Sequence, residues 1–172
     1  MNKTVFTTKS LVTASLLSAV SIVLSRFCVI YFTDSLRLSF GNIPIMLTGL
    51  LLGPVAGATV GAVSDILGSA LLSGFGWYPP LTVTPMLIGL AAGLFRKTVM
   101  KKRSFLPVLC TTLTANASGT MLWSTFCLSR LYGMPLLSLA AVRVPFYIAV
   151  AVVEAVVIFG LMKASALERI IK

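Results

Sequence analysis

The sequence contains no histidine and only four acidic residues among its 172 positions. Without histidine a Ser-His-Asp triad cannot be built, and the common zinc sites lose their nitrogen donor. The three cysteines, Cys28, Cys110 and Cys127, are far apart and form no CxxC spacing, so apolar packing is expected for them rather than metal binding. We therefore expect neither an enzyme nor a protein that holds a cofactor or a metal.

Charged residues are also scarce, at 10% of the chain, whereas 58% of the residues are hydrophobic. A soluble domain of this size needs more polar residues to cover its surface. Apolar runs long enough to cross a bilayer recur from end to end. The sequence thus predicts an all-α integral membrane protein, with a single transmembrane domain over residues 1–172.

Six transmembrane helices are predicted from these apolar runs and from the glycine and proline residues that end them. They cover residues 11–30, 43–52, 54–72, 81–95, 105 to about 126, and 142–162, with a short surface helix at 136–141. The second helix is the shortest, since ten residues rise only about 15 Å. The intervening stretches, including the basic 96–103 and the polar 128–135, are expected to be loops.

The net charge of +10 is distributed unevenly along the chain. Six spans place both termini on one side, together with the loop before the fifth span. Ten cations then share that side: Lys3, Lys9, Arg96, Lys97, Lys101, Lys102, Arg103, Lys163, Arg169 and Lys172. The positive-inside rule assigns this side to the cytoplasm of a cell membrane. The same placement argues against a nucleic-acid partner.

The octet GAVSDILG, residues 61–68, places a carboxylate within an apolar helix. Asp65 lies about 10 Å below the outer surface, where an unpaired charge costs several kcal/mol. Gly57, Gly61 and Gly68 share its helix face, and small residues allow helices to approach closely in lipid. Asp65 is therefore expected to face protein rather than lipid.

Three arginines fall in the same outer layer as Asp65. Arg26 lies about 22 Å along the first helix, Arg37 in the first outer loop, and Arg143 at the outer end of the sixth helix. Other side chains predicted to reach this layer are Phe75, Trp77, Tyr78, Asn116, Trp123 and Tyr147. The pattern indicates a pocket, open to the outside, for a planar anionic molecule. The alternative is an internal salt-bridge network, in which Asp65 neutralises one arginine.

Glu154 is a second buried acid, about 16 Å deeper than Arg143 along the sixth helix. No basic residue is expected at its level. It is either protonated or hydrogen-bonded to a hydroxyl group, and a proton-coupling role is an alternative.

These residues resemble a known family. The stretch LRLSFGNIPIMLTGLLLGPVAGATVGAVSDILG, residues 36–68, and the aromatic turn GFGWYPPLTVTP, residues 74–85, are similar to the substrate-binding (S) component of energy-coupling factor (ECF) vitamin transporters, most of all to folate-specific members. The resemblance implies a vitamin pocket near the outer face, capped by the first loop and by the aromatic turn. It also implies that a membrane coupling subunit and two cytoplasmic ATP-binding subunits energise uptake, because this chain has no ATPase of its own.

The resemblance implies roles for particular residues. Ser15 and Ala19 would meet the coupling subunit, unless these small residues serve internal helix packing. Asp65 would accept two hydrogen bonds from the pterin edge of folate, and the arginines would bind its glutamate carboxylates. The pterin ring would stack on Trp77, Tyr78, Phe40 or the face of an arginine. Two alternatives stay open: an S component for another vitamin, and a self-sufficient proton-coupled transporter that uses Glu154.

Overall fold

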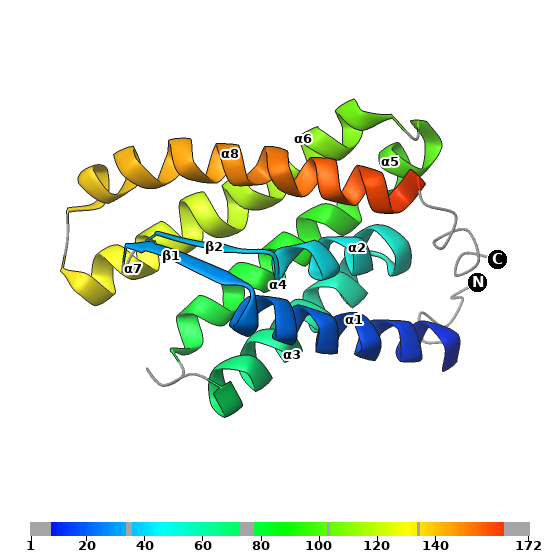
Figure 1. Cartoon of the computed structure of the whole chain (residues 1–172), viewed down its shortest axis with the longest axis horizontal. Helices are drawn as coiled ribbons and strands as arrows, with labels where there is room; N and C mark the ends of the chain where they lie inside the picture. Colours follow the sequence, from blue (N-terminus) through cyan, green and yellow to red (C-terminus); the bar gives the residue numbers. More distant parts are fainter. Residues whose placement is uncertain (1–7, 34–35, 73–77, 103, 134, 164–172) are drawn as a thin grey trace.

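The computed structural model describes residues 8–33, 36–72, 78–102, 104–133 and 135–163, with the side chains of 30–33, 36–38, 71, 72 and 102 left aside. Its elements, in chain order, are α1 (Thr8–Phe27), β1 (Val29–Thr33), β2 (Leu36–Ser39), α2 (Asn42–Leu52), α3 (Pro54–Leu72), α4 (Pro79–Leu94), α5 (Arg96–Lys102), α6 (Phe105–Asn116), the π-helix η1 (Ala117–Ser124), α7 (Thr125–Tyr132) and α8 (Leu136–Lys163). Figure 1 shows the long helices running roughly side by side along the molecule.

A β-hairpin follows α1, where the sequence predicted the end of a helix and a loop. Strands β1 and β2 pair antiparallel, with Val29 opposite Ser39 and Tyr31 opposite Arg37. The first helix ends at Phe27, three residues before the predicted end. The run VIYF favours extended backbone, because β-branched and aromatic residues pack well on a pleated surface. The prediction of an all-α fold is therefore wrong at this hairpin.

The chain after α4 is more helical than predicted. The basic residues 96–102, expected to be a loop, form α5. The fifth predicted span continues through η1 and α7 to Tyr132, where Gly133 caps it with a φ of 66°. The expected surface helix at 136–141 is the first part of α8, a continuous helix that contains Pro145. A proline removes one backbone hydrogen bond but does not end a helix that its neighbours support.

Glycines bring α2, α3 and α4 into close contact, as the sequence predicted for its small-residue face. A Cβ on Gly57 would lie 2.5 Å from the carbonyl oxygen of Gly89, and a Cβ on Gly49 would meet the same oxygen at the same distance. A Cβ on Gly61 would overlap the carbonyl of Pro85. These backbones can touch only because the side chains are absent.

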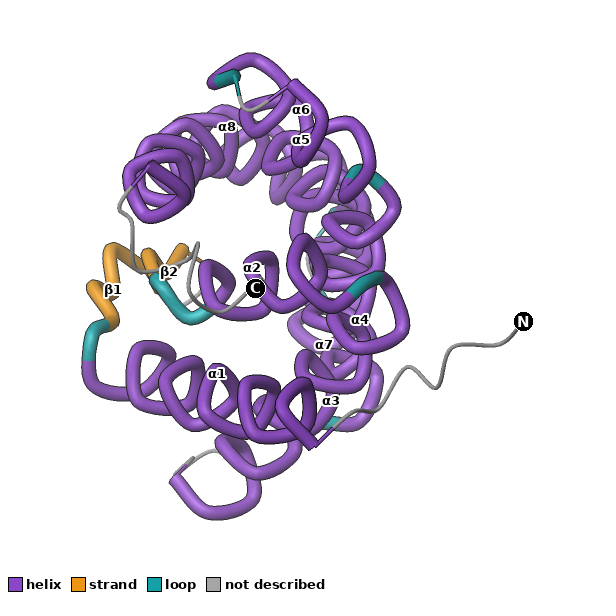
Figure 2. The backbone as a smooth tube through the Cα atoms, turned by 90° about the vertical axis from the view of Figure 1, so that its right-hand side faces the viewer, coloured by secondary structure: helices purple, strands orange, loops and turns teal. Residues whose placement is uncertain are grey.

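Helix α2 occupies the middle of the bundle. All its residues from Ile43 to Leu50 are buried. Figure 2, an end-on view, shows α2 between α1 and α3 on one side and α6 and α8 on the other. The core comprises Met46, Leu50, Ile88, Val99, Val108 and Ile158, among others.

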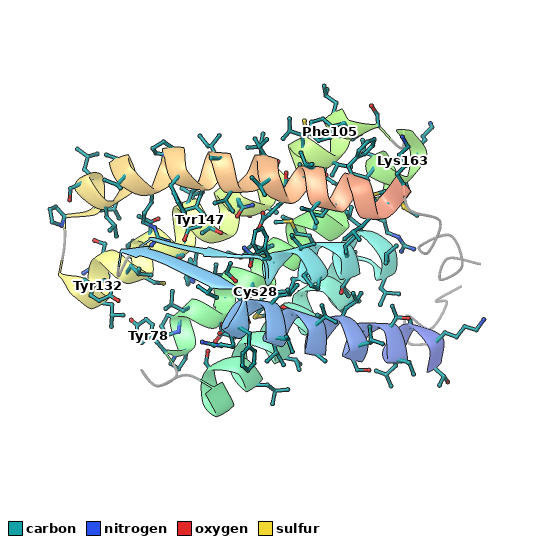
Figure 3. All side chains as sticks on the ribbon, viewed as in Figure 1. Cys28, Tyr78, Phe105, Tyr132, Tyr147 and Lys163 are labelled. Carbon is teal, nitrogen blue, oxygen red and sulfur yellow. The ribbon has the colours of Figure 1, made fainter. Side chains whose placement is uncertain are left out.

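The outer surface is apolar. Leu11, Val12 and Leu16 of α1 are all more than half exposed, as suits side chains that face lipid. Among the described residues, α1 and α8 are long and apolar enough to cross a membrane, and α2 and α4 are shorter apolar helices. In Figure 1 the start of α1, the basic helix α5 and the end of α8 lie at one end of the molecule. Figure 3 labels Lys163 at that end and Tyr78 and Tyr132 toward the other.

Candidate functional site

The predicted site residues divide into two groups that the fold separates. Asp65 and Arg26 lie on α3 and α1, and Arg143 lies on α8. Helix α3 packs on α1, α2 and α4, whereas α8 packs on α6, η1, α7 and α2. The single outer layer predicted from helix depth therefore draws its side chains from two groups of helices, one formed by α1, α3 and α4 and the other by α6, η1, α7 and α8.

The first cluster links α1, α3 and α4. Thr82 Oγ1 donates a hydrogen bond to Asp65 Oδ2 at 2.8 Å. Arg26 Nη2 donates to Ser69 Oγ at 2.9 Å. The Arg26 guanidinium crosses α3 at Gly68, where an added Cβ would lie 3.2 Å from Nε. As predicted, Asp65 is directed at a neighbouring helix, with a threonine hydroxyl as one of its partners.

The second cluster begins at Arg143, which is 2% exposed. Its Nε donates to Thr125 Oγ1 and its Nη2 to Ser124 Oγ, both at 3.1 Å. The Arg143 Cζ lies 5.1 Å from the centroid of the Tyr147 ring, a cation–π contact one helical turn away. The prediction that Tyr147 shares the face of Arg143 is thus confirmed, and α7 and η1 hold the guanidinium in a fixed orientation.

Asn116 lies deeper than the sequence indicated. Its Nδ2 donates to Glu154 Oε2 at 2.6 Å and to the carbonyl oxygen of Thr112 at 3.1 Å. Thr120 Oγ1 in turn donates to Asn116 Oδ1 at 3.1 Å. Asn116 and Glu154 are both completely buried. Asn116 therefore sits at the level of Glu154, and the partner of that carboxylate is an amide rather than the predicted hydroxyl.

Together these contacts form a polar seam between α8 and the α6–η1–α7 rod. Its members are Thr112, Asn116, Thr120, Ser124, Thr125, Arg143, Tyr147 and Glu154, all buried. Sequence reasoning missed the seam hydroxyls, although Thr112, Thr120 and Ser124 recur at multiples of four from Asn116. This spacing was the available signal. The π-helical turn at η1, a feature often found at functional sites, lies within the seam.

The aromatic residues of the predicted site are less concentrated. Trp123 Nε1 donates to the carbonyl oxygen of Pro80 at 2.7 Å, which ties η1 to the start of α4. Tyr78 precedes α4 directly, and Phe40 packs against the core. The side chain of Arg37 and the whole of Phe75 and Trp77 lie outside the described residues.

Ser15 and Ala19 are both exposed on α1. The Ser15 hydroxyl donates within its own helix, to the carbonyl oxygen of Leu11 at 2.7 Å. The two small residues thus lie on the apolar outer face with Leu16, and they do not serve packing within the described part of the chain.

An open groove of about 620 Å³ lies at the end of the seam near Arg143. It runs between α7 and the start of α8, and its lining residues are Phe126, Ser129, Arg130, Gly133, Pro135 and Leu136. None of the predicted site residues whose side chains the structure describes lines it.

Known proteins agree with this fold along nearly the whole chain. The model of a family described as "ECF-type riboflavin transporter, S component" matches residues 5–167. The Folate transporter FolT of Clostridium novyi (strain NT) is 31% identical over 144 residues, which are 83% of this chain and 81% of that protein.

Two solved structures are similar throughout. A crystal structure of FolT bound with folic acid has a TM-score of 0.78 and 28% identity, and the match covers 90% of this chain and 93% of that one. An S component of a bacterial ECF transporter has a TM-score of 0.69 and 28% identity, with 94% and 98% covered. The resemblance inferred from residues 36–68 and 74–85 is confirmed, and the matching family is one of membrane transport components. The chain belongs to the family of S components of ECF-type transporters that this model describes.

Proposed function

We propose that this chain is the folate-binding S component of an ECF-type transporter and mediates folate uptake across the cell membrane. The observation that carries the proposal is its similarity, over 90% of its length, to FolT bound with folic acid. High affinity is part of the proposal, because the seam residues are held by hydrogen bonds before any ligand arrives and so lose little freedom on binding.

The chemistry of the seam supports an anionic, aromatic ligand. Arg143 presents a planar guanidinium, which suits a carboxylate. Tyr147, next to it, offers a ring to a flat aromatic group of the ligand. A cationic vitamin would be repelled by the same arginine.

Riboflavin is the second candidate, because the matching family model is described by that vitamin. A panel of vitamins measured for equilibrium binding to the purified chain in detergent separates the two. We expect folate to bind far more tightly than riboflavin or thiamine. Folate binding no tighter than millimolar, beside a tight alternative, would end the folate proposal. The self-sufficient proton-coupled transporter has no observation in its favour, since the family is that of ECF components.

In the membrane, six spans are proposed: α1, α2, α3, α4, the α6–η1–α7 rod and α8. The end that carries Lys9, helix α5 and Lys163 is proposed to face the cytoplasm, by the positive-inside rule. The Arg143 end of the seam then faces outward, where folate arrives.

A coupling subunit and two ATP-binding subunits are the proposed partners, with the exposed Ser15 and Ala19 at the contact. Ala19→Trp is expected to prevent assembly with the coupling subunit while folate binding by the isolated chain stays within about twofold of the parent, because a large side chain blocks close helix approach. Co-purification of the coupling subunit and folate titration measure the two effects. Val156→Trp, at an exposed apolar site on α8, is the matched control and should assemble normally. Normal assembly of Ala19→Trp would remove Ala19 from the interface.

A further inference from the structure

The carboxylate of Glu154 is the most unusual group in the membrane interior. It is completely buried, and one of its oxygens accepts the bond from Asn116. The other oxygen, Oε1, has no hydrogen-bond partner in the described part of the chain, although the side chain of Asn42 lies close to the carboxylate. A buried acceptor left in this state is costly, so a donor supplied by a ligand would stabilise it.

Glu154 lies on the same face of α8 as Arg143 and Tyr147. Eleven residues separate Arg143 from Glu154, a rise of about 16 Å. The buried residues between them on this face include Val150 and Ala151, both of which are apolar. One helix therefore presents a cation, an aromatic ring, an apolar stretch and a carboxylate in that order. Extended folate carries its carboxylates, its benzoyl ring and its pterin in the matching order.

Asn42 connects this carboxylate to the hairpin. It is the first residue of α2, and the turn at Phe40 and Gly41 joins it to β2. In Figure 1 the hairpin extends from α2 toward the end where α7 and α8 meet. A ligand that entered under the hairpin would thus run along the seam from Arg143 and reach Asn42 and Glu154 last.

We propose that Glu154, positioned by Asn116, binds the pterin edge of folate at the inner end of the seam, while Arg143 binds the glutamate carboxylate at its outer end. This inference rests on the proposed folate function. The adjacent N–H donors of the amino-pyrimidinone ring face the two carboxylate oxygens, so that Oε1 gains its missing partner. The contact is a charge-assisted pair with two-point geometry, which discriminates against rings that lack the donors.

Asp65, to which the sequence assigned this role, is less suited to it. Thr82 already donates to Asp65 across the α3–α4 interface, and α3 does not pack on α8. The role of Asp65 at the pterin stays a prediction, and the two carboxylates can be compared directly by the same chemical change.

The test measures three ligands on one set of variants: folate, pteroate without the glutamate, and p-aminobenzoylglutamate without the pterin. Glu154→Gln keeps the shape of the side chain but removes its charge. We expect it to weaken folate and pteroate binding about 10- to 100-fold, the loss of a charge-assisted hydrogen bond, and to leave p-aminobenzoylglutamate within about twofold. Asp65→Asn tests the competing assignment: if Glu154 binds the pterin, this variant should not show the selective loss of folate and pteroate.

Three results would overturn the inference. Unchanged pteroate binding by folded Glu154→Gln would show that the carboxylate does not bind the pterin. An equal loss for all three ligands would indicate a general structural effect. A pterin-specific loss in Asp65→Asn alone would return the role to Asp65. Glu154→Asp, which withdraws the carboxylate by one methylene, should show the same ligand selectivity with a smaller loss, and it decides the question if the glutamine variant does not fold. If the parent binds riboflavin and not folate, the proposed function itself fails, which is a different outcome from folate binding that ignores Glu154.

Discussion

Gly89→Ala is expected to lower the free energy of unfolding by about 3 kcal/mol, the upper part of the range for overpacked sites. The added Cβ would overlap the carbonyl group of Gly57, and both partners are backbone atoms that cannot rotate away. Separating α3 from α4 would also disturb the contacts of Gly49 and Gly61, which depend on the same close approach. The thermal midpoint of the purified protein in detergent measures the loss.

Gly160→Ala is the matched control for this prediction. Gly160 lies in α8 with no atom within 4 Å of an added Cβ. Alanine there should raise stability by up to about 1 kcal/mol, because it favours the helix more than glycine does. Equal shifts in the two variants would contradict the idea that backbone contact, rather than helix propensity, fixes glycine at position 89.

Arg143→Gln is expected to weaken folate binding about 100-fold, or about 3 kcal/mol. The change removes the charge that meets the glutamate carboxylate. It also releases Ser124 and Thr125 and ends the cation–π contact with Tyr147. Arg143→Lys should recover only part of the affinity, since an ammonium group lacks the planar fork. Equilibrium binding of folate to each purified variant gives the ratio of dissociation constants.

Arg130→Gln controls for the loss of one positive charge. Arg130 lies on α7, at the same end of the molecule, but it is exposed and contacts the ring of Phe126. Folate binding by this variant should stay within about threefold of the parent, because an exposed charge is screened by solvent and salt. Equal losses at 130 and 143 would mean that general charge at this end attracts folate and that Arg143 has no particular role.

The fold could be predicted where a pattern is local. Apolar runs bounded by glycine and proline predicted α2 and α3 to within one residue at each end. The hairpin was missed because VIYF continues the apolar run of the first helix, and a short apolar run does not by itself distinguish a helix from a strand. Helix α5 was missed because its polarity resembled that of a loop, although Val99 is fully buried against the core.

The candidate site was predicted residue by residue but not as an arrangement. Depth, counted from helix rise, correctly joined Arg143 to Tyr147. It could not show that Asp65 and Arg143 point into different helix interfaces, since depth says nothing of rotation about the bundle axis. Asn116 was wrongly assigned to the outer layer. The packing of α6 and η1 on α8 decides which residues of these helices lie at the same depth, and it places Asn116 beside Glu154.

The sequence by itself determined the class of the protein. The chain has few charges, long apolar runs and cations gathered in three places, and this pattern requires a membrane domain. The length of an apolar run and the position of its flanking cations can be read from the sequence without knowing how the helices pack. Only the tertiary structure decided which charged groups meet. Whether a carboxylate faces a threonine, an amide or a ligand depends on how helices turn toward one another, and that is fixed by contacts such as those of Gly57 with Gly89, between residues far apart in the chain.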